Sequence, residues 1–137
     1  MKSNNLVVDL CHAKGLKKVG FPQDTFFYYS VLEDNKIFLN SQHAYECEVD
    51  KDFVGKLKEE TYSAPTAEEI FQYLPNYISG HCGNLNGFPL GQLQVEILND
   101  GEYEVSFELE HDPNFSNKSL SIALSEMYIY LKEVGLL

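Results

Sequence analysis

Apolar and polar residues alternate along the last third of the chain. Apolar side chains recur at every second position on either side of a polar stretch: Leu93, Val95, Ile97, Tyr103, Val105, Phe107 and Leu109. Period two is typical of strands with one buried face. The two sets share a face only if Ile97 lies opposite Tyr103, Val95 opposite Val105 and Leu93 opposite Phe107. The loop is then residues 99–101, with Gly101 at the position that requires a positive φ.

A helical period follows the hairpin. Apolar residues three or four positions apart form one stripe, made by Leu120, Leu124, Met127, Leu131 and Val134. Ser119 or Asn117 is suited to cap the start of this helix, and Gly135 to follow its end. Ile122 and Ile129 fall on the opposite side of the helical wheel. We expect this second apolar pair to contact another element or another chain, or to be covered by neighbouring side chains.

Residues 5–18 also follow a helical period, with Leu6, Leu10 and Ala13 on one stripe. Gly20 is suited to terminate this helix. Its last turn is basic, through Lys14, Lys17 and Lys18. Positive charge at this end complements the helix dipole, which supports the assignment.

A first hairpin is predicted directly after this helix. Residues 26–32 are aromatic and β-branched, which is typical of a strand, and residues 36–39 form the return strand after a turn at 33–35. Because residues 26–32 are apolar on both faces, we expect this strand to be central in its sheet or covered on both sides.

The middle of the chain contains a sharp helix start. Residues 66–69 read Thr-Ala-Glu-Glu, the pattern of a capping box, and predict a helix over residues 67–74 that Pro75 ends. The inward side of this helix would be made by Ile70, Phe71 and Leu74.

Two segments are less regular. Residues 50–59 predict a short helix, and the glycines of residues 79–92 predict a long loop of a kind that is often functional. We expect one globular domain over residues 1–137. Its class is α+β: an antiparallel sheet of about four strands in two hairpins, about three helices, and the C-terminal helix packed on the sheet.

The charge of the chain disfavours some classes of binding partner. Its 10 basic residues are all lysines, and with 21 acidic residues the formal net charge is −11. Without arginine the chain has no bidentate group for phosphate or guanine, and its charge disfavours direct binding to nucleic acid or to an anionic membrane. No apolar run approaches the ~20 residues of a membrane-spanning helix, and no signal-peptide pattern is present. We therefore expect a cytoplasmic protein with reduced cysteines.

Histidine and cysteine occur in three pairs: Cys11 with His12, His43 with Cys47, and His81 with Cys82. Zinc binds such side chains, but no C-x-x-C pair is present, and adjacent residues rarely direct both side chains at one ion. We expect no metal and no cofactor, and the set to test is His43, Cys47, His81 and Cys82. Cys82 beside His81 is also a candidate thiol nucleophile, although catalytic pairs usually come from different elements.

Three stretches carry a resemblance to known proteins. The N-terminal helix ends in a glycine before Phe-Pro-Gln, residues 62–75 read Tyr-Ser-Ala-Pro-Thr-Ala-Glu-Glu-Ile-Phe-Gln-Tyr-Leu-Pro, and a Tyr-Glu-Val-Ser-Phe strand precedes the closing helix. The chain resembles a set of short uncharacterised proteins of bacteriophages, prophages and other bacterial mobile elements. The resemblance implies a hairpin followed by a closing helix and a mobile-element origin. It carries no catalytic or ligand-binding residue.

Carboxylates alternate along the second strand of the closing hairpin, at Glu102, Glu104, Glu108 and Glu110. Such a row is typical of a solvated face that keeps a hairpin soluble. A dense acidic face also has the charge to imitate a phosphate backbone. An acidic inhibitor that mimics DNA and occupies a host nucleic-acid-binding enzyme is therefore an alternative function.

These patterns together favour a non-enzymatic protein that acts by protein–protein contact or self-association. Its partner is then another protein or a second copy in a homodimer, and Ile122 and Ile129 are the binding face to test. A small zinc- or thiol-dependent enzyme is the third hypothesis.

Overall fold

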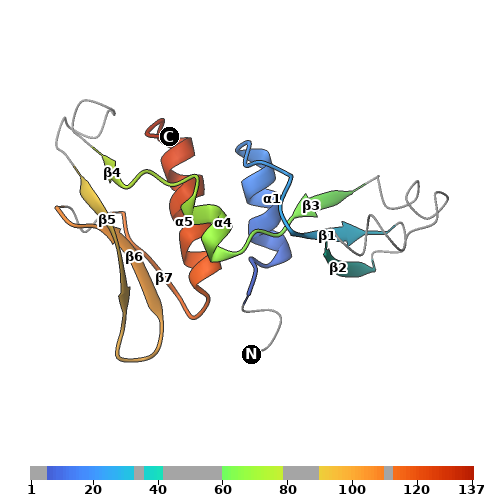
Figure 1. The fold of residues 1–137 in the computed structure, drawn as a ribbon, viewed down its shortest axis with the longest axis horizontal. Helices are drawn as coiled ribbons and strands as arrows, with labels where there is room; N and C mark the ends of the chain where they lie inside the picture. The colour runs from blue at the N-terminus through green and yellow to red at the C-terminus, as the bar shows by residue number, and fades with distance from the viewer. Residues whose placement is uncertain (1–5, 33–35, 42–59, 79–89, 110–112) are drawn as a thin grey trace.

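The computed structural model of the protein describes residues 6–32, 36–41, 60–78, 90–109 and 113–137. Within these ranges the helices are α1 (Leu10–Lys18), α4 (Ala67–Phe71) and α5 (Leu120–Glu133). The strands are β1 (Phe27–Val31), β2 (Ile37–Ser41), β3 (Thr61–Ser63), β4 (Tyr77–Ile78), β5 (Gly91–Ile97), β6 (Tyr103–Phe107) and β7 (Phe115–Asn117). Figure 1 shows the helices in the middle of the molecule, with strands on either side.

The strands form two antiparallel sheets. One has the order β2-β1-β3 and the other β4-β5-β6-β7. The predicted α+β class is confirmed, as are its three helices and the C-terminal helix on a sheet. The two predicted hairpins, however, lie in separate sheets, beside α1 and beside α5 (Figure 1). Three short strands complete these sheets, and their two or three residues are too few to show a period in the sequence.

The closing hairpin has the predicted register. Ile97 lies opposite Tyr103, and the pairs at Val95 and Leu93 follow from it. The Leu98 amide donates to the Glu102 carbonyl (2.8 Å), which closes the three-residue loop, and Gly101 has a φ of 85°. The alternation of apolar residues was therefore sufficient to predict the register and the three-residue turn.

Helix α5 is capped as expected. The Ser119 hydroxyl accepts from the Ile122 amide (3.4 Å), the Asn117 side chain accepts from the Ser119 amide (2.9 Å), and Gly135 follows with a φ of 78°. The middle of the predicted stripe is fully buried, at Leu124, Met127 and Leu131. The helix contacts β6 and β7, so it covers part of the second sheet, and it also contacts α4 and α1.

Helix α1 begins at Leu10, not at residue 5 as its period predicted. Asp9 caps it, with a carboxylate oxygen that accepts from the His12 amide (2.8 Å). The β-branched Val7 instead forms a bridge to Thr66, and the Val8 amide donates to a carbonyl on the same segment. The β-branched pair and the cap residue together outweigh the apolar period at this end.

Helix α4 has the predicted capping box, with Thr66 and Glu69 bonded in both directions. It ends at Phe71 instead of continuing to Leu74, because the last turn tightens through a bond from the Tyr73 amide to the Ile70 carbonyl (3.0 Å). Ile70 and Leu74 are buried as predicted, but Phe71 is 38% exposed, so its predicted inward position was wrong.

Strand β1 is central in the first sheet, which was one of the two predicted alternatives. Ser30 is its one buried residue, and the others are half-buried. The predicted turn at 33–35 and helix at 50–59 lie outside the described residues, as does most of the 79–92 loop. The loop was predicted to reach residue 92, but β5 already begins at Gly91, whose φ of 83° brings its backbone against Glu108.

Candidate interaction surfaces

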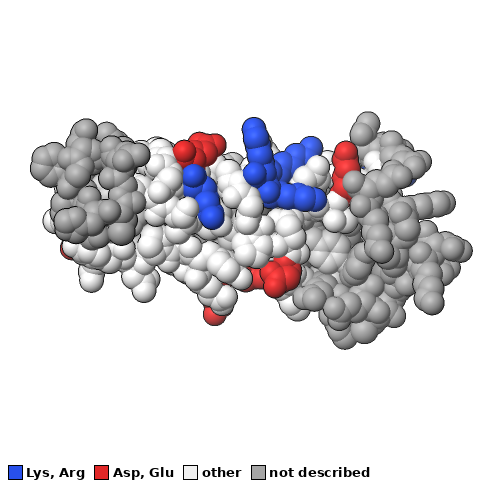
Figure 2. All heavy atoms as spheres, turned by 90° about the horizontal axis from the view of Figure 1, so that it is seen from above, with Lys and Arg blue, Asp and Glu red and all other residues white. Residues whose placement is uncertain are grey.

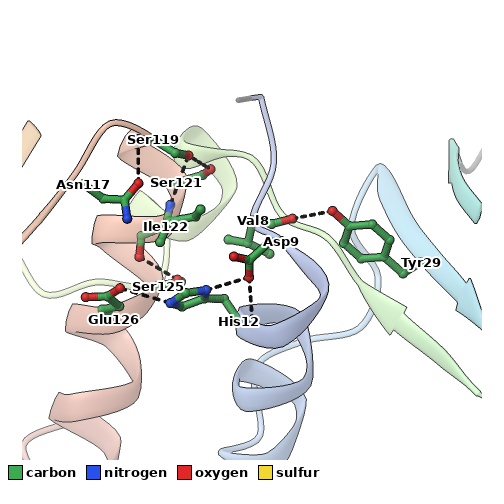
Figure 3. A network of polar contacts seen from close by, with 10 residues as sticks. All are labelled: Val8, Asp9, His12, Tyr29, Asn117, Ser119, Ser121, Ile122, Ser125 and Glu126. Carbon is green, nitrogen blue, oxygen red and sulfur yellow. Dashed lines mark hydrogen bonds and ion pairs between the residues drawn. The ribbon is translucent and has the colours of Figure 1, made fainter. Parts of the chain in front are cut away.

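Helices α1 and α5 lie side by side and run in the same direction (Figure 1). His12 joins them, with Nδ1 2.6 Å from Asp9 Oδ1 and Nε2 3.0 Å from Glu126 Oε1 (Figure 3). Both ring nitrogens of His12 are engaged by carboxylates of the fold, so this residue links α1 to α5.

The serines near this link are used within the fold. The Ser119 and Ser121 hydroxyls bond to each other (2.9 Å), and the Ser125 hydroxyl donates to the Ile122 carbonyl (2.7 Å), as Figure 3 shows. These bonds satisfy buried hydroxyls inside a helix, as expected for serine on a packed helical face. Among the described residues, no serine hydroxyl is bonded to His12.

Ile122 and Ile129 are both half-buried on α5. Ile129 faces α1: its Cδ1 atom lies 3.0 Å from the position that a Cβ on Gly15 would take. This contact is one helical turn beyond the His12–Glu126 link on both helices. The second apolar side of α5 thus contacts another element of the same chain at Ile129, and a binding role for the pair stays a prediction.

Lysine side chains gather over the middle of the face in Figure 2. Lys14 and Lys17 of α1 lie over the Tyr62 ring, with Nζ 5.6 Å and 4.9 Å from its centroid, and Lys17 also donates to the Thr61 carbonyl (2.9 Å). All three contacts are with β3. They give these lysines a role in packing α1 on the first sheet, in addition to the predicted complement to the helix dipole.

The metal hypothesis concerns residues that the structure leaves undescribed. His43, Cys47, His81 and Cys82 all lie outside the described ranges. Among the described residues no group of three or more His, Cys, Asp or Glu side chains is placed to hold a metal ion, and Cys11 is an exposed free thiol.

The closing hairpin carries an exposed apolar face. Val105 and Phe107 on β6 are buried beneath α5, but their neighbours on β5 are not: Val95 is 37% exposed and Ile97 is 73% exposed. Leu109 is exposed as well, so the period-two pattern was wrong about burial at three of its positions. For Val95 and Ile97 the physical reason is visible in Figure 1, where the hairpin turn that follows them lies away from the helices.

The backbone of β5 is also open along one edge. Strand β4 pairs with it only at Gly91 and Gln92, and the last bond runs from the Leu93 amide to the Asn76 carbonyl (2.9 Å). Backbone groups alternate in direction along a strand, so those of Val95 and Ile97 point the same way as those of Leu93, away from β6. No described residue pairs with them there.

The other face of the hairpin is acidic. Glu96 lies directly opposite Glu104, and Glu102 and Glu108 share the face by parity. Like charges directly across an antiparallel pair are unfavourable. Among the described residues none forms an ion pair with these carboxylates.

A second set of exposed apolar residues lies on β2, made by Ile37, Phe38 and Leu39. Strand β2 continues at Ser41 directly into residues outside the described range. Strand β5, by contrast, is bounded by the described strands β4 and β6, so its exposed surface is the better defined of the two.

Comparison with protein-family models, with curated proteins and with solved structures found no match to this chain. Within the described ranges, no helix has both the length and the apolar character needed to cross a membrane. Sequence patterns had indicated neither the His12 link nor the open edge of β5. The spacing of Asp9 and His12 was a signal for the first half of the link, but Glu126 is 114 residues further along the chain.

Proposed function

We propose that this chain is a non-enzymatic protein that binds another protein, or a second copy of itself, through the exposed apolar face of the β5–β6 hairpin. The observation that carries the proposal is the exposure of Ile97 (73%) beside Val95 in a strand whose neighbours are described on both sides. Exposed apolar side chains that adjoin one another are typical of contact surfaces. The proposal includes a mobile-element origin, which the resemblance supports, and a cytoplasmic location, with which an odd number of cysteines, three, is consistent.

Affinity capture from a bacterial extract tests this proposal, with light scattering to detect self-association. We expect the wild-type chain to retain a partner, or to form a dimer, and Ile97→Asp to lose it because the substitution places a charge on the contact face. The matched control is Leu6→Asp, which changes an exposed apolar residue outside the hairpin. A monomeric chain that retains no protein, or a partner unaffected by Ile97→Asp, would contradict the proposal.

The second candidate is an acidic inhibitor that mimics DNA. It is favoured by one observation: Glu96 and Glu104 lie across from each other, with Glu102 and Glu108 on the same face. Replacing Glu96 and Glu104 with glutamine would then release inhibition of a DNA-binding enzyme, measured in a DNA mobility-shift competition, while Ile97→Asp would leave inhibition intact. The opposite pattern supports the first proposal.

A further inference from the structure

The shape of the open edge restricts what can bind there. The Leu98 amide bonds to the Glu102 carbonyl on β6, so Glu96 and Gln94 also direct their backbone groups toward β6. Val95 and Ile97 therefore present one N–H and one C=O each at the edge that β4 leaves open. The groups that match such an edge are those of an extended strand.

The side chains on the two faces of β5 restrict the occupant further. Val95 and Ile97 are exposed on the α5 side, whereas Glu96 and the neighbouring Glu104 are on the opposite side. Side chains of an added strand alternate between the same two faces. Its residues on one face would then lie beside apolar groups, and those on the other beside carboxylates.

We propose that the free edge of β5 adds an extended segment of a partner protein, and that this segment alternates apolar and basic residues. This inference rests on the proposed function and specifies the partner. The segment lies along β5 past the last bond with Asn76, bonds to the backbone of Val95 and Ile97, and places lysine or arginine beside Glu96, with Glu104 one strand further away. The basic side chains relieve the repulsion between these two carboxylates.

A fluorescent peptide of about eight residues that alternates valine and lysine tests the inference by anisotropy. We expect it to bind the wild-type chain, and a valine–glutamate peptide to bind about tenfold more weakly because its charges repel Glu96 and Glu104. Glu96→Gln with Glu104→Gln should weaken binding of the lysine peptide, whereas Asp24→Asn, an exposed control away from the hairpin, should not.

Ile97→Pro tests the backbone directly. Proline removes the outward N–H of Ile97, which has no partner on β6, and proline is tolerated on an edge strand when its missing donor faces solvent. We expect binding to weaken about tenfold, and Ile97→Thr, which keeps the N–H, to lose less. Equal binding to wild type and to Ile97→Pro would overturn the inference.

Amide hydrogen exchange of the wild-type chain gives a second readout that does not depend on a variant. The Val95 and Ile97 amides should exchange fast alone and become protected with the lysine peptide. Absence of protection overturns strand addition, and equal binding of the two peptides overturns the proposed preference for basic residues. A wild-type dimer that Ile97→Pro dissociates also overturns the inference, because the occupant is then a second copy. If capture of a partner still depends on Ile97 while the peptide does not bind, the proposed function stands and this inference falls.

Discussion

Tyr29 of β1 is a single residue that joins the first sheet to the segment before α1. Its hydroxyl donates to the Val8 carbonyl (2.8 Å), as Figure 3 shows. Burial raises the pKa of the Tyr29 phenol above its ordinary value, and the nearby charge of Asp9 raises it further. The neutral phenol is therefore the form that the folded chain prefers.

Stability should accordingly fall in alkaline solution. The pKa of Tyr29 in the folded chain lies above the unfolded value of 10.0. Its contribution to the free energy of unfolding is therefore complete below about pH 10 and is lost as the pH rises through the folded pKa. Tyr128 has a raised pKa, mainly from burial, and adds to the same loss. Urea unfolding between pH 8 and about pH 11 should show a smaller alkaline decline for Tyr29→Phe than for wild type. Equal declines would contradict the assignment.

His12 is the second residue that links separate parts of the chain. His12→Ala removes both contacts with Asp9 and Glu126, and we expect it to lower the free energy of unfolding by about 1 kcal/mol, because the carboxylates are only partly buried. Cys11→Ala, at the neighbouring exposed position, should change it by less than about 0.5 kcal/mol. Denaturant unfolding of both variants at neutral pH measures the difference, and equal effects would rule out a stabilising link.

At the scale of elements, the sequence correctly predicted the turns and helix caps that depend on neighbouring residues. The Asn-Asp-Gly loop, the capping box at Thr66 and the cap at Ser119 all formed because each depends on residues within a few positions. Strands β3, β4 and β7 did not have such a signal, since pairing with distant strands defines them. The open edge of β5 follows from the shortness of β4, so it was equally beyond a local pattern.

The capping box of α4 also contacts Phe26, the residue directly before β1. Glu69 accepts from the Thr66 amide with Oε1 and from the Phe26 amide with Oε2 (both 3.0 Å). Glu69→Ala should therefore lower the free energy of unfolding by about 1–2 kcal/mol. Glu68→Ala, at an exposed position in the same turn, should cost less than about 0.5 kcal/mol. Thermal unfolding of the two variants compares them, and similar losses would count against a special role for Glu69.

The packing of α1 on α5 can be tested at Gly15. Alanine there gains about 0.5–1 kcal/mol of helix propensity, but its Cβ would lie 3.0 Å from Cδ1 of Ile129. Ile129→Val removes that atom. We therefore expect Gly15→Ala to stabilise the chain more in the Ile129→Val background than in wild type. A double-mutant cycle by urea unfolding measures the coupling, and strict additivity would show that the helices do not meet there.

At the scale of the whole molecule, helices separate the two sheets, and the second sheet extends beyond the helix that covers it (Figure 1). Period two predicted the apolar face of the hairpin correctly, but no periodicity states how far a distant helix reaches along it. This is why Val95 and Ile97 were expected to be buried and are exposed.

The difference in burial along the hairpin can be tested at the cross-strand pair Val95 and Val105. Val105 is fully buried and Val95 is not, although they lie opposite each other on one face. Val105→Ala should lower the free energy of unfolding by about 2 kcal/mol and Val95→Ala by less than about 0.5 kcal/mol. Chemical denaturation of both variants tests this, and comparable losses would mean that the face is covered along its length.

The parallel arrangement of α1 and α5 has a consequence for how the chain is made. The earliest helix of the described chain packs against the latest, through residues as far apart as His12 and Glu126. Contacts between such distant positions slow folding, because a long loop must close before they form. During synthesis α1 leaves the ribosome well before its packing partner exists. Helix α1 therefore stays without that partner until residues 120–133 have been translated.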